Sequence, residues 1–124
     1  MNTETHPWPP FIPDQAKILI LGTFPPASNR WCMDFYYPNP TNDFWRIMGL
    51  IFYNNKFHFY DQQARTFRID DIKKFLTERG IALHDTGAEI IRTKGNASDK
   101  YLEIIRPVNR RIISRYLSDA LPFV

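Results

Sequence analysis

Two short apolar runs constrain the fold of this chain more than any other feature. Ile18–Leu21 is uninterrupted by polar residues and is closed by Gly22, and Ile81–Leu83 directly follows Gly80. Runs of this length without alternation are typical of strands that are buried on both faces, as in a parallel sheet. Helical patterns lie between and after the two runs, and alternating strands and helices predict an α/β fold. We therefore expect a three-layer α/β/α domain with a mainly parallel central sheet.

Two helices are predicted between these strands. Thr41 or Asn42 can cap the first helix, and Gly80 ends the second. The first helix carries an apolar stripe at helical spacing, formed by Phe44, Ile47, Met48, Ile51 and Phe52. The second helix places on one face Ile69, Ile72, Phe75 and Leu76. The connection over residues 54–67 has no clear pattern.

The last part of the chain predicts two further helices and the start of a strand. Ser98 can cap a short helical turn that extends to about Ile104, and Pro107 can open a longer helix. The inward positions of this longer helix are Val108, Ile112, Ile113, Tyr116, Leu117 and Leu121. Residues 122–124 then predict the beginning of a third strand, so the sheet is expected to be incomplete at the C-terminus.

Composition indicates one globular domain. The chain has 124 residues, of which 44% are hydrophobic and 15% aromatic, and one domain is the usual number at this length. Residues 1–15 are expected to form a Pro-rich arm and residues 16–124 the domain. With a single cysteine, Cys32, a reducing compartment is expected. No apolar run approaches the ~20 residues that a membrane-spanning helix needs, so we expect a cytoplasmic protein.

The expected functional site lies at the carboxyl ends of the two predicted strands. In open parallel sheets the ligand crevice lies outside these strand ends. The loop after Gly22 is long and rich in proline and aromatic residues, and loops of this length in a compact domain are usually functional. We therefore expect the site to be built from residues 22–45 and 84–99.

Two motifs in these loops carry a resemblance to a known family. Gly22-Thr23-Phe24-Pro25-Pro26 follows the first strand, and residues 36–45 read Tyr-Tyr-Pro-Asn-Pro-Thr-Asn-Asp-Phe-Trp. Together they resemble the uracil-DNA glycosylase superfamily, and most closely its mismatch-specific and hypoxanthine-DNA glycosylase branches. The second motif matches at Tyr37, Pro40, Asn42 and Phe44-Trp45, and the similarity covers residues 16–124.

The sequence departs from that family in two places. The mismatch-specific branch has an asparagine at the position of Phe24, and phenylalanine can neither hold nor deprotonate a water molecule. The hypoxanthine branch also lacks this asparagine. The family's second motif, a His-Pro-Ser type loop, follows a strand later than Val124, so we expect a C-terminally truncated domain. Such a fragment, with an open sheet edge, is expected to aggregate, dimerise or pack loosely.

The resemblance implies a binding site for a base that has been flipped out of DNA. Tyr37 stands at the family's stacking position, and the Gly22–Pro25 backbone would approach the base closely; this base-binding set is Gly22, Thr23, Phe24, Pro25 and Tyr37. The alternatives are that Tyr37 packs beneath the loop, like Phe35 and Tyr36, and that the Gly22 loop is an ordinary turn.

Three polar residues are candidates for catalysis. Asn42 can orient a water or read a base edge, although an asparagine before a helix is also a standard N-cap. Asp34 and Asp85 are carboxylates on crevice loops that can activate water or stabilise a cationic sugar. Solvated loop acids without a role are the alternative for both.

The DNA backbone can be contacted by basic residues in the last third of the chain, for which the candidates are Lys94, Lys100 and Arg110. A solvated charged face explains the same residues. The histidines, His6, His58 and His84, are scattered in sequence without a partner at ligand spacing, so no metal or other cofactor is predicted.

Three functions remain open at this point. The first is a glycosylase that removes a deaminated base, uracil or hypoxanthine, from DNA by hydrolysis. The second is a catalytically inactive relative that binds nucleic acid or protein, since fold does not imply function. The third is an α/β domain that binds a nucleotide-like small molecule. A net charge of +3 permits nucleic-acid binding without arguing for it.

Overall fold

The computed structural model describes residues 3–92, 102–107 and 121–123. By their internal contacts the residues divide into two compact units. One unit is discontinuous in sequence and comprises Met1–Phe24 and Leu76–Val124. The other, Pro25–Phe75, is a continuous segment inserted into the first. Because the relative placement of the two units is not determined, each unit is treated separately below.

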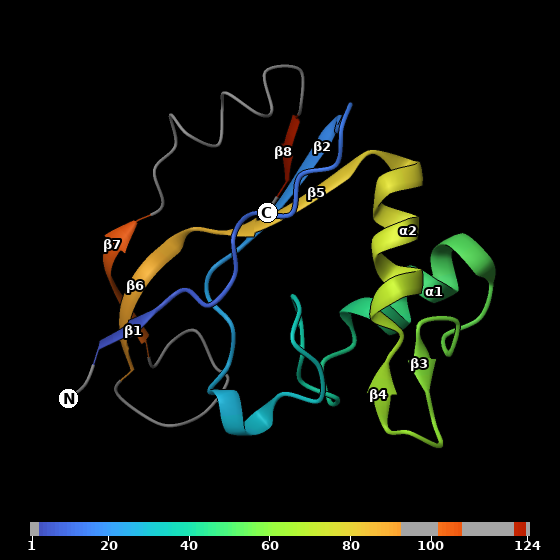
Figure 1. Cartoon of the computed structure of the whole chain (residues 1–124), viewed down its shortest axis with the longest axis horizontal. Helices are drawn as coiled ribbons and strands as arrows, with labels where there is room; N and C mark the ends of the chain where they lie inside the picture. The colour runs from blue at the N-terminus through green and yellow to red at the C-terminus, as the bar shows by residue number, and fades with distance from the viewer. Residues whose placement is uncertain (1–2, 93–101, 108–120, 124) are drawn as a thin grey trace. The chain divides into compact units, whose positions relative to one another are not determined.

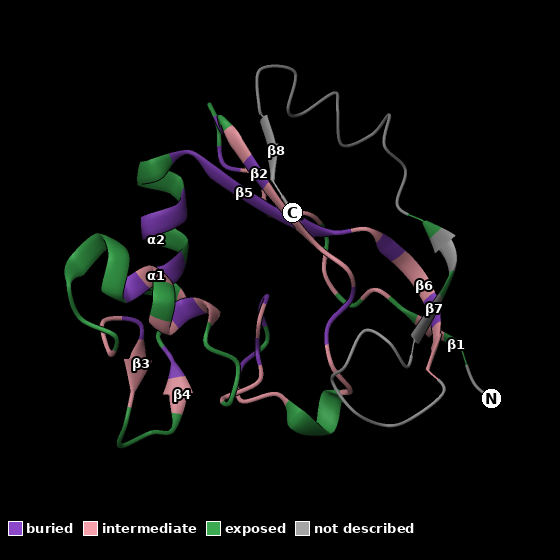
Figure 2. Ribbon diagram, turned by 180° about the vertical axis from the view of Figure 1, so that it is seen from behind, coloured by how far each residue is buried: buried purple, intermediate pink, exposed green. Residues whose placement is uncertain are grey.

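The discontinuous unit contains a three-stranded parallel sheet in the order β5-β2-β8 (Figure 1). Strand β2 spans Ile18–Gly22, β5 spans Ile81–Asp85, and β8 spans Leu121–Phe123. Both neighbours of β2 run parallel to it, with Ile18 opposite Ile81 on one side and opposite Leu121 on the other. The two strands that the apolar runs predict are therefore present, and so is the strand predicted to begin near residue 122. All five residues of β5 are buried (Figure 2).

A second sheet of the same unit is antiparallel and has the order β1-β6-β7. Its strands are β1 (Thr3–Thr5), β6 (Gly87–Arg92) and β7 (Leu102–Pro107). The helical turn predicted to reach Ile104 is wrong for residues 102–104, because β7 pairs antiparallel with β6. The β-branched pair Ile104-Ile105 suits a strand once a partner strand is available. The helix predicted to begin at Pro107 and to include Leu121 is wrong at both ends, because Pro107 is the last residue of β7 and Leu121 is the first residue of β8. Positions 108–120 of that prediction lie outside the described residues.

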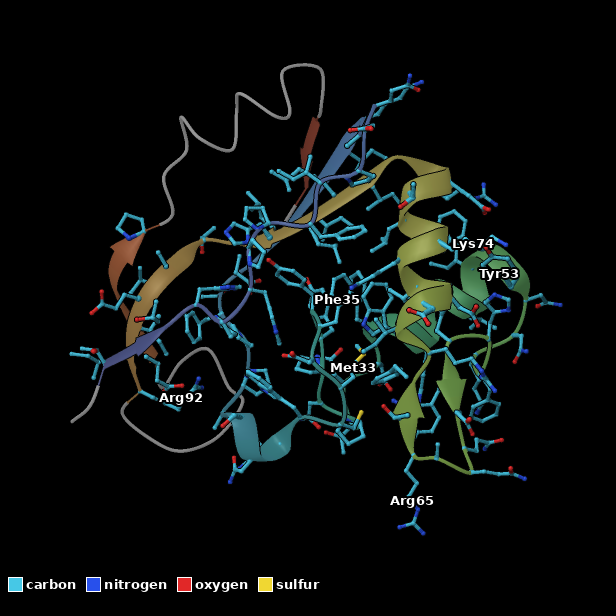
Figure 3. The ribbon with its side chains drawn as sticks, viewed as in Figure 1. Met33, Phe35, Tyr53, Arg65, Lys74 and Arg92 are labelled. Carbon is cyan, nitrogen blue, oxygen red and sulfur yellow. The ribbon has the colours of Figure 1, made fainter. Side chains whose placement is uncertain are left out.

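The predicted N-terminal arm is part of the discontinuous unit and pairs with its strands at two places. Strand β1 pairs with β6, with Thr3 opposite Ile91. Further along, Phe11 and Leu83 exchange two backbone hydrogen bonds, of 3.0 and 2.9 Å. Glu4 also accepts a hydrogen bond of 2.9 Å from Arg92, whose side chain is labelled in Figure 3. The arm thus extends the antiparallel sheet and contacts the parallel one.

The continuous unit contains helix α1, a hairpin and most of helix α2. Helix α1 spans Phe44–Tyr53, as predicted. Residues 54–67, which had no clear pattern, contain the two-stranded hairpin of β3 (Tyr60–Asp61) and β4 (Thr66–Phe67). The Asp61 side chain accepts hydrogen bonds from the backbone N–H groups at positions 63 and 64, which orders the turn. These hydrogen bonds lower the pKa of Asp61.

The predicted apolar stripe of α1 is wrong in orientation. Ile47 and Ile51 are 52% and 67% exposed, whereas the helix buries Trp45 and Gly49. The indole N–H of Trp45 donates to the carbonyl oxygen of Tyr36 at 2.8 Å. This buried hydrogen bond places the Trp45 face of the helix inward. At Gly49 a side chain would collide with the chain that follows, since a Cβ would lie 2.6 Å from the carbonyl oxygen of Asn55.

Helix α2 spans Ile69–Arg79, and the boundary between the units falls within it. Its predicted apolar face is confirmed, because Ile72, Phe75 and Leu76 are almost completely buried. Gly80 ends the helix with φ +68°, a left-handed conformation that favours glycine. Its carbonyl oxygen then accepts the N–H of Lys17 at 2.7 Å, next to the start of β2.

The structure is a small α/β fold of helices and mixed sheets. The three-layer arrangement and the parallel sheet as the centre of the molecule stay predictions. Within the described ranges, no helix has both the length and the apolar character needed to cross a bilayer.

Candidate functional site

The carboxyl ends of β2 and β5 lie side by side in the discontinuous unit. Gly22, the last residue of β2, is opposite Asp85, the last residue of β5. The pairing continues past the strands, because Thr86 and Gly87 donate N–H bonds of 2.9 Å to the carbonyl oxygens of Gly22 and Thr23. Gly22, Thr23 and Asp85, which were predicted as site residues from distant parts of the sequence, are therefore neighbours.

His6 from the N-terminal arm joins Asp85 at this position. Its Nε2 atom lies 2.8 Å from Oδ2 of Asp85, and the exposed fractions of the two side chains are only 5% and 8%. A carboxylate can only accept, so Nε2 carries the proton and donates it. The pair is a charge-assisted hydrogen bond when Asp85 is ionised, which is the stronger kind.

The other ring nitrogen of His6 faces the backbone of Trp8. Nδ1 lies 2.8 Å from the Trp8 carbonyl oxygen and 3.2 Å from the Trp8 nitrogen. A protonated Nδ1 can donate to the carbonyl, and an unprotonated Nδ1 can accept from the N–H. The Trp8 backbone therefore provides a partner for either protonation state of the ring, and the Nε2–Asp85 bond persists in both.

Three aromatic rings surround the imidazole of His6. Phe24 meets it nearly at right angles with ring centres 5.3 Å apart, and Trp8 does so at 5.9 Å. The ring of His84 lies 4.9 Å away. Edge-to-face packing of this kind fixes the ring plane. Phe24, predicted to touch a base, thus contacts His6 in this structure.

His84 is a buried neighbour of the pair. Its burial, and secondly the positive charge that His6 can carry, lower the pKa of His84 to about 4. His84 is therefore neutral near pH 7. His84 thus adds no positive charge beside His6.

Sequence reasoning missed His6 and treated the three histidines as scattered. This interpretation is wrong for His6 and His84, whose rings are neighbours. His6 follows β1, which pairs with β6, and His84 lies near the end of β5. One signal was available in the sequence. Thr3-Glu4-Thr5 alternates β-branched and charged residues, which is typical of an edge strand. Pairing of such a strand with β6 brings the following residue, His6, close to the end of β5.

In the continuous unit, Tyr37 is held as an aromatic platform. Its ring stacks on Phe44 with centres 4.0 Å apart and an angle of 7° between the planes, and Trp45 meets it edge-on. Phe35 and Tyr36 are buried, whereas Tyr37 is only half-buried. The backbone of Tyr37 has φ +56°, which costs a residue other than glycine about 1–3 kcal/mol.

Asn42 stabilises the beginning of α1 in the same unit. Its Oδ1 atom accepts the backbone N–H of Phe44 at 2.8 Å. The prediction that Thr41 or Asn42 is the N-cap is nevertheless wrong, because the N-cap of α1 is Asp43, which makes no side-chain capping hydrogen bond, and Asn42 acts from the position before it. Asn42 is exposed, and its amide NH₂ makes no hydrogen bond to the described residues. The donor side of the amide remains available to a ligand.

The other predicted site residues are distributed as follows. Pro25 is buried and Asp34 is exposed, both in the continuous unit. The predicted DNA-backbone contacts Lys94, Lys100 and Arg110 lie outside the described residues. Gly22, Thr23, Phe24 and Asp85 belong to the discontinuous unit.

A surface pocket of about 580 Å³ lies elsewhere in the continuous unit, at the beginning of α2. It is lined by Cys32, Met33, Thr66, Phe67, Arg68, Ile69, Asp70 and Asp71. None of the residues predicted for base binding or catalysis lies in this lining. Among the described positions, no group of three His, Cys, Asp or Glu residues is arranged to hold a metal ion.

The chain was compared with protein-family models, curated proteins and solved structures, and none matches. The residues described above therefore carry the functional argument.

Proposed function

We propose that the protein is a DNA glycosylase that removes a deaminated base, uracil or hypoxanthine, by hydrolysis of the N-glycosidic bond. The observation that carries this proposal is the state of Tyr37. It is the half-exposed member of three consecutive aromatic residues, and it alone among them has a left-handed backbone. A ring presented at such a cost and backed by Phe44 suits stacking against a flat ligand.

The reaction needs a base removed from the helix and a water molecule that attacks the sugar. The water oxygen forms a bond with C1′ while the bond from C1′ to the base nitrogen breaks, and the electron pair leaves with the base. The proton lost by the water is accepted by a carboxylate, and the departing base gains a proton from solvent. The products are a free base and an abasic sugar, and no metal or redox partner is required.

Base release from oligonucleotides tests this proposal. The full-length protein is incubated with duplexes that contain uracil, hypoxanthine or only normal bases, and free base is measured. Release from one of the two damaged duplexes is expected. Tyr37→Ala should lower the rate roughly 5- to 150-fold, because base stacking contributes about 1–3 kcal/mol. Tyr37→Phe keeps the ring and should retain most of the activity.

Asn42 offers a matched pair of variants. Asn42→Asp keeps a side-chain oxygen that can accept the Phe44 N–H and removes the NH₂ donor, whereas Asn42→Ala removes both. If the amide reads the base, both variants lose activity while only Asn42→Ala loses stability. If Asn42 only stabilises the beginning of α1 by accepting the Phe44 N–H, Asn42→Asp keeps its activity.

The second candidate is a nucleic-acid-binding protein without catalysis. It is favoured by the burial of Asp85, whose side chain is 8% exposed and already bonded to His6. In this case no duplex releases a base, and DNA binds with an affinity that falls steeply with salt and ignores damage. Tyr37→Ala should then weaken binding to single-stranded DNA.

A further inference from the structure

Asp85 presents its two carboxylate oxygens differently. Oδ2 accepts the hydrogen bond from His6, whereas Oδ1 makes no hydrogen bond to the described residues. Asp85 also lies at the end of β5, opposite Gly22. A carboxylate that is fixed through one oxygen can direct the other oxygen to one position only. Such an arrangement suits a proton acceptor, which must be held within hydrogen-bond reach of the proton it removes.

His6 is itself fixed more firmly than a residue of a flexible arm. Its backbone N–H donates to the carbonyl oxygen of Ala88 at 2.8 Å, which extends the pairing of β1 with β6 by one residue. The ring is held by the Trp8 backbone and by the edges of Phe24 and His84. Glu4 and Arg92 form an ion pair of 2.9 Å two residues before His6. The arm therefore delivers the imidazole in one orientation.

We propose that His6 is a positioning residue, which holds Asp85 through Oδ2 so that Oδ1 accepts the proton of the attacking water. This inference rests on the proposed glycosylase function and assigns His6 a role in it through Asp85. His6 acts through Asp85 and does not touch the substrate. In the catalytic step the water proton passes to Oδ1, the water oxygen bonds to C1′, and the base leaves with the electron pair of the broken bond.

Two substitutions of His6 by an amide side chain distinguish a role in positioning Asp85 from a role in packing alone. The amide nitrogen of glutamine can reach the place of Nε2 and donate to Asp85, whereas that of asparagine reaches only the place of Nδ1. His6→Gln should therefore keep most of kcat. His6→Asn should lower kcat roughly tenfold, with little change in KM, which is less than the roughly 10²-fold loss expected when Asp85→Asn removes the acceptor.

Glu4→Gln is the control for docking of the arm. It weakens the ion pair between Glu4 of β1 and Arg92 of β6, and it leaves His6 and Asp85 in place. It should lower the melting temperature slightly and leave kcat unchanged. Each variant is measured for melting temperature and for kcat and KM on the uracil and hypoxanthine duplexes.

The outcomes are distinct. Loss of kcat in His6→Asn with retention in His6→Gln supports the positioning role. Equal kcat in both variants, or an equal loss in His6→Asn and Glu4→Gln, overturns it while leaving the proposed function standing. If the wild-type protein releases no base, the proposed function fails and the positioning role fails with it. If His6→Asn does not fold, loss of activity in folded His6→Gln overturns the inference.

Discussion

The indole nitrogen of Trp45 donates a hydrogen bond of 2.8 Å to the carbonyl oxygen of Tyr36, nine positions earlier, and both residues are buried. This contact joins the aromatic loop to the first turn of α1. Tyr37 follows directly after the acceptor, so the same bond anchors the backbone that presents the Tyr37 ring. The Tyr37 ring is thus held by stacking on Phe44 and by an edge-on contact with Trp45.

Trp45→Phe should destabilise the protein by about 1–3 kcal/mol, because a buried carbonyl group loses its partner and packing volume is lost. The free energy of unfolding in urea measures this. The substitution should also lower base release on the proposed function, since the Tyr37 backbone loses its anchor. A Trp45→Phe variant with wild-type stability and activity would show that the hydrogen bond is needed neither for folding stability nor for base release.

Gly49→Ala should destabilise the protein although alanine is the better helix former. Helix propensity favours alanine by about 1 kcal/mol. Against this, the new Cβ would lie 2.6 Å from the carbonyl oxygen of Asn55, so the backbone must shift. Overpacking of this kind costs about 1–3 kcal/mol. Leu50→Ala, at an exposed site in the same helix, is the control and should change stability by about 0.5 kcal/mol or less.

Gly80→Ala should cost about 1–2 kcal/mol, because φ at this position is +68° and an added Cβ would lie 3.3 Å from the carbonyl oxygen of Gln15. Gly80→Asn should cost less, since asparagine tolerates the left-handed conformation better. Denaturant midpoints of the two variants are compared. An alanine variant as stable as the wild type would mean that the helix ends in another way.

Stability should fall as pH falls from about 6.5 toward 4. The pKa of His84 is about 4 in the folded protein against an ordinary 6.5, so in this window the unfolded chain binds the proton and the folded protein does not. The free energy of unfolding should change with pH by less than about 1.4 kcal/mol per pH unit, which is the limit for one proton. His84→Gln should flatten the dependence of stability on pH in this window relative to the wild type. Urea denaturation of both proteins at several pH values measures this.

The parts of the fold that could be predicted are those that local sequence determines. Ile18–Leu21 and Ile81–Leu83 could satisfy neither an amphipathic helix nor an exposed strand, and Gly80 marks a left-handed turn between α2 and β5. These elements are present as expected. The strand predicted to begin near residue 122 is also confirmed, because β8 pairs with β2.

The parts that could not be predicted depend on long-range partners. Residues 102–104 carry a usable helical pattern, and pairing with β6 makes them a strand. The rotation of α1 is set by a hydrogen bond to Tyr36 and a close approach at Gly49, neither of which periodicity contains. His6 reaches Asp85 across 79 positions, and a pairing between an arm and a distant strand leaves little local signal.

The insertion of one unit into the other sets an order on folding during synthesis. Pro25–Phe75 is continuous and can form its own contacts once it has left the ribosome. The discontinuous unit has to wait, because β1 pairs with residues near position 90 and β2 pairs with β5 and β8. We therefore expect nascent chains in which residue 75 has left the ribosome, while β5 is still inside it, to protect α1 from proteolysis although the arm with His6 is still cleaved. On this expectation the Asp85 pair is among the last parts of the protein to assemble.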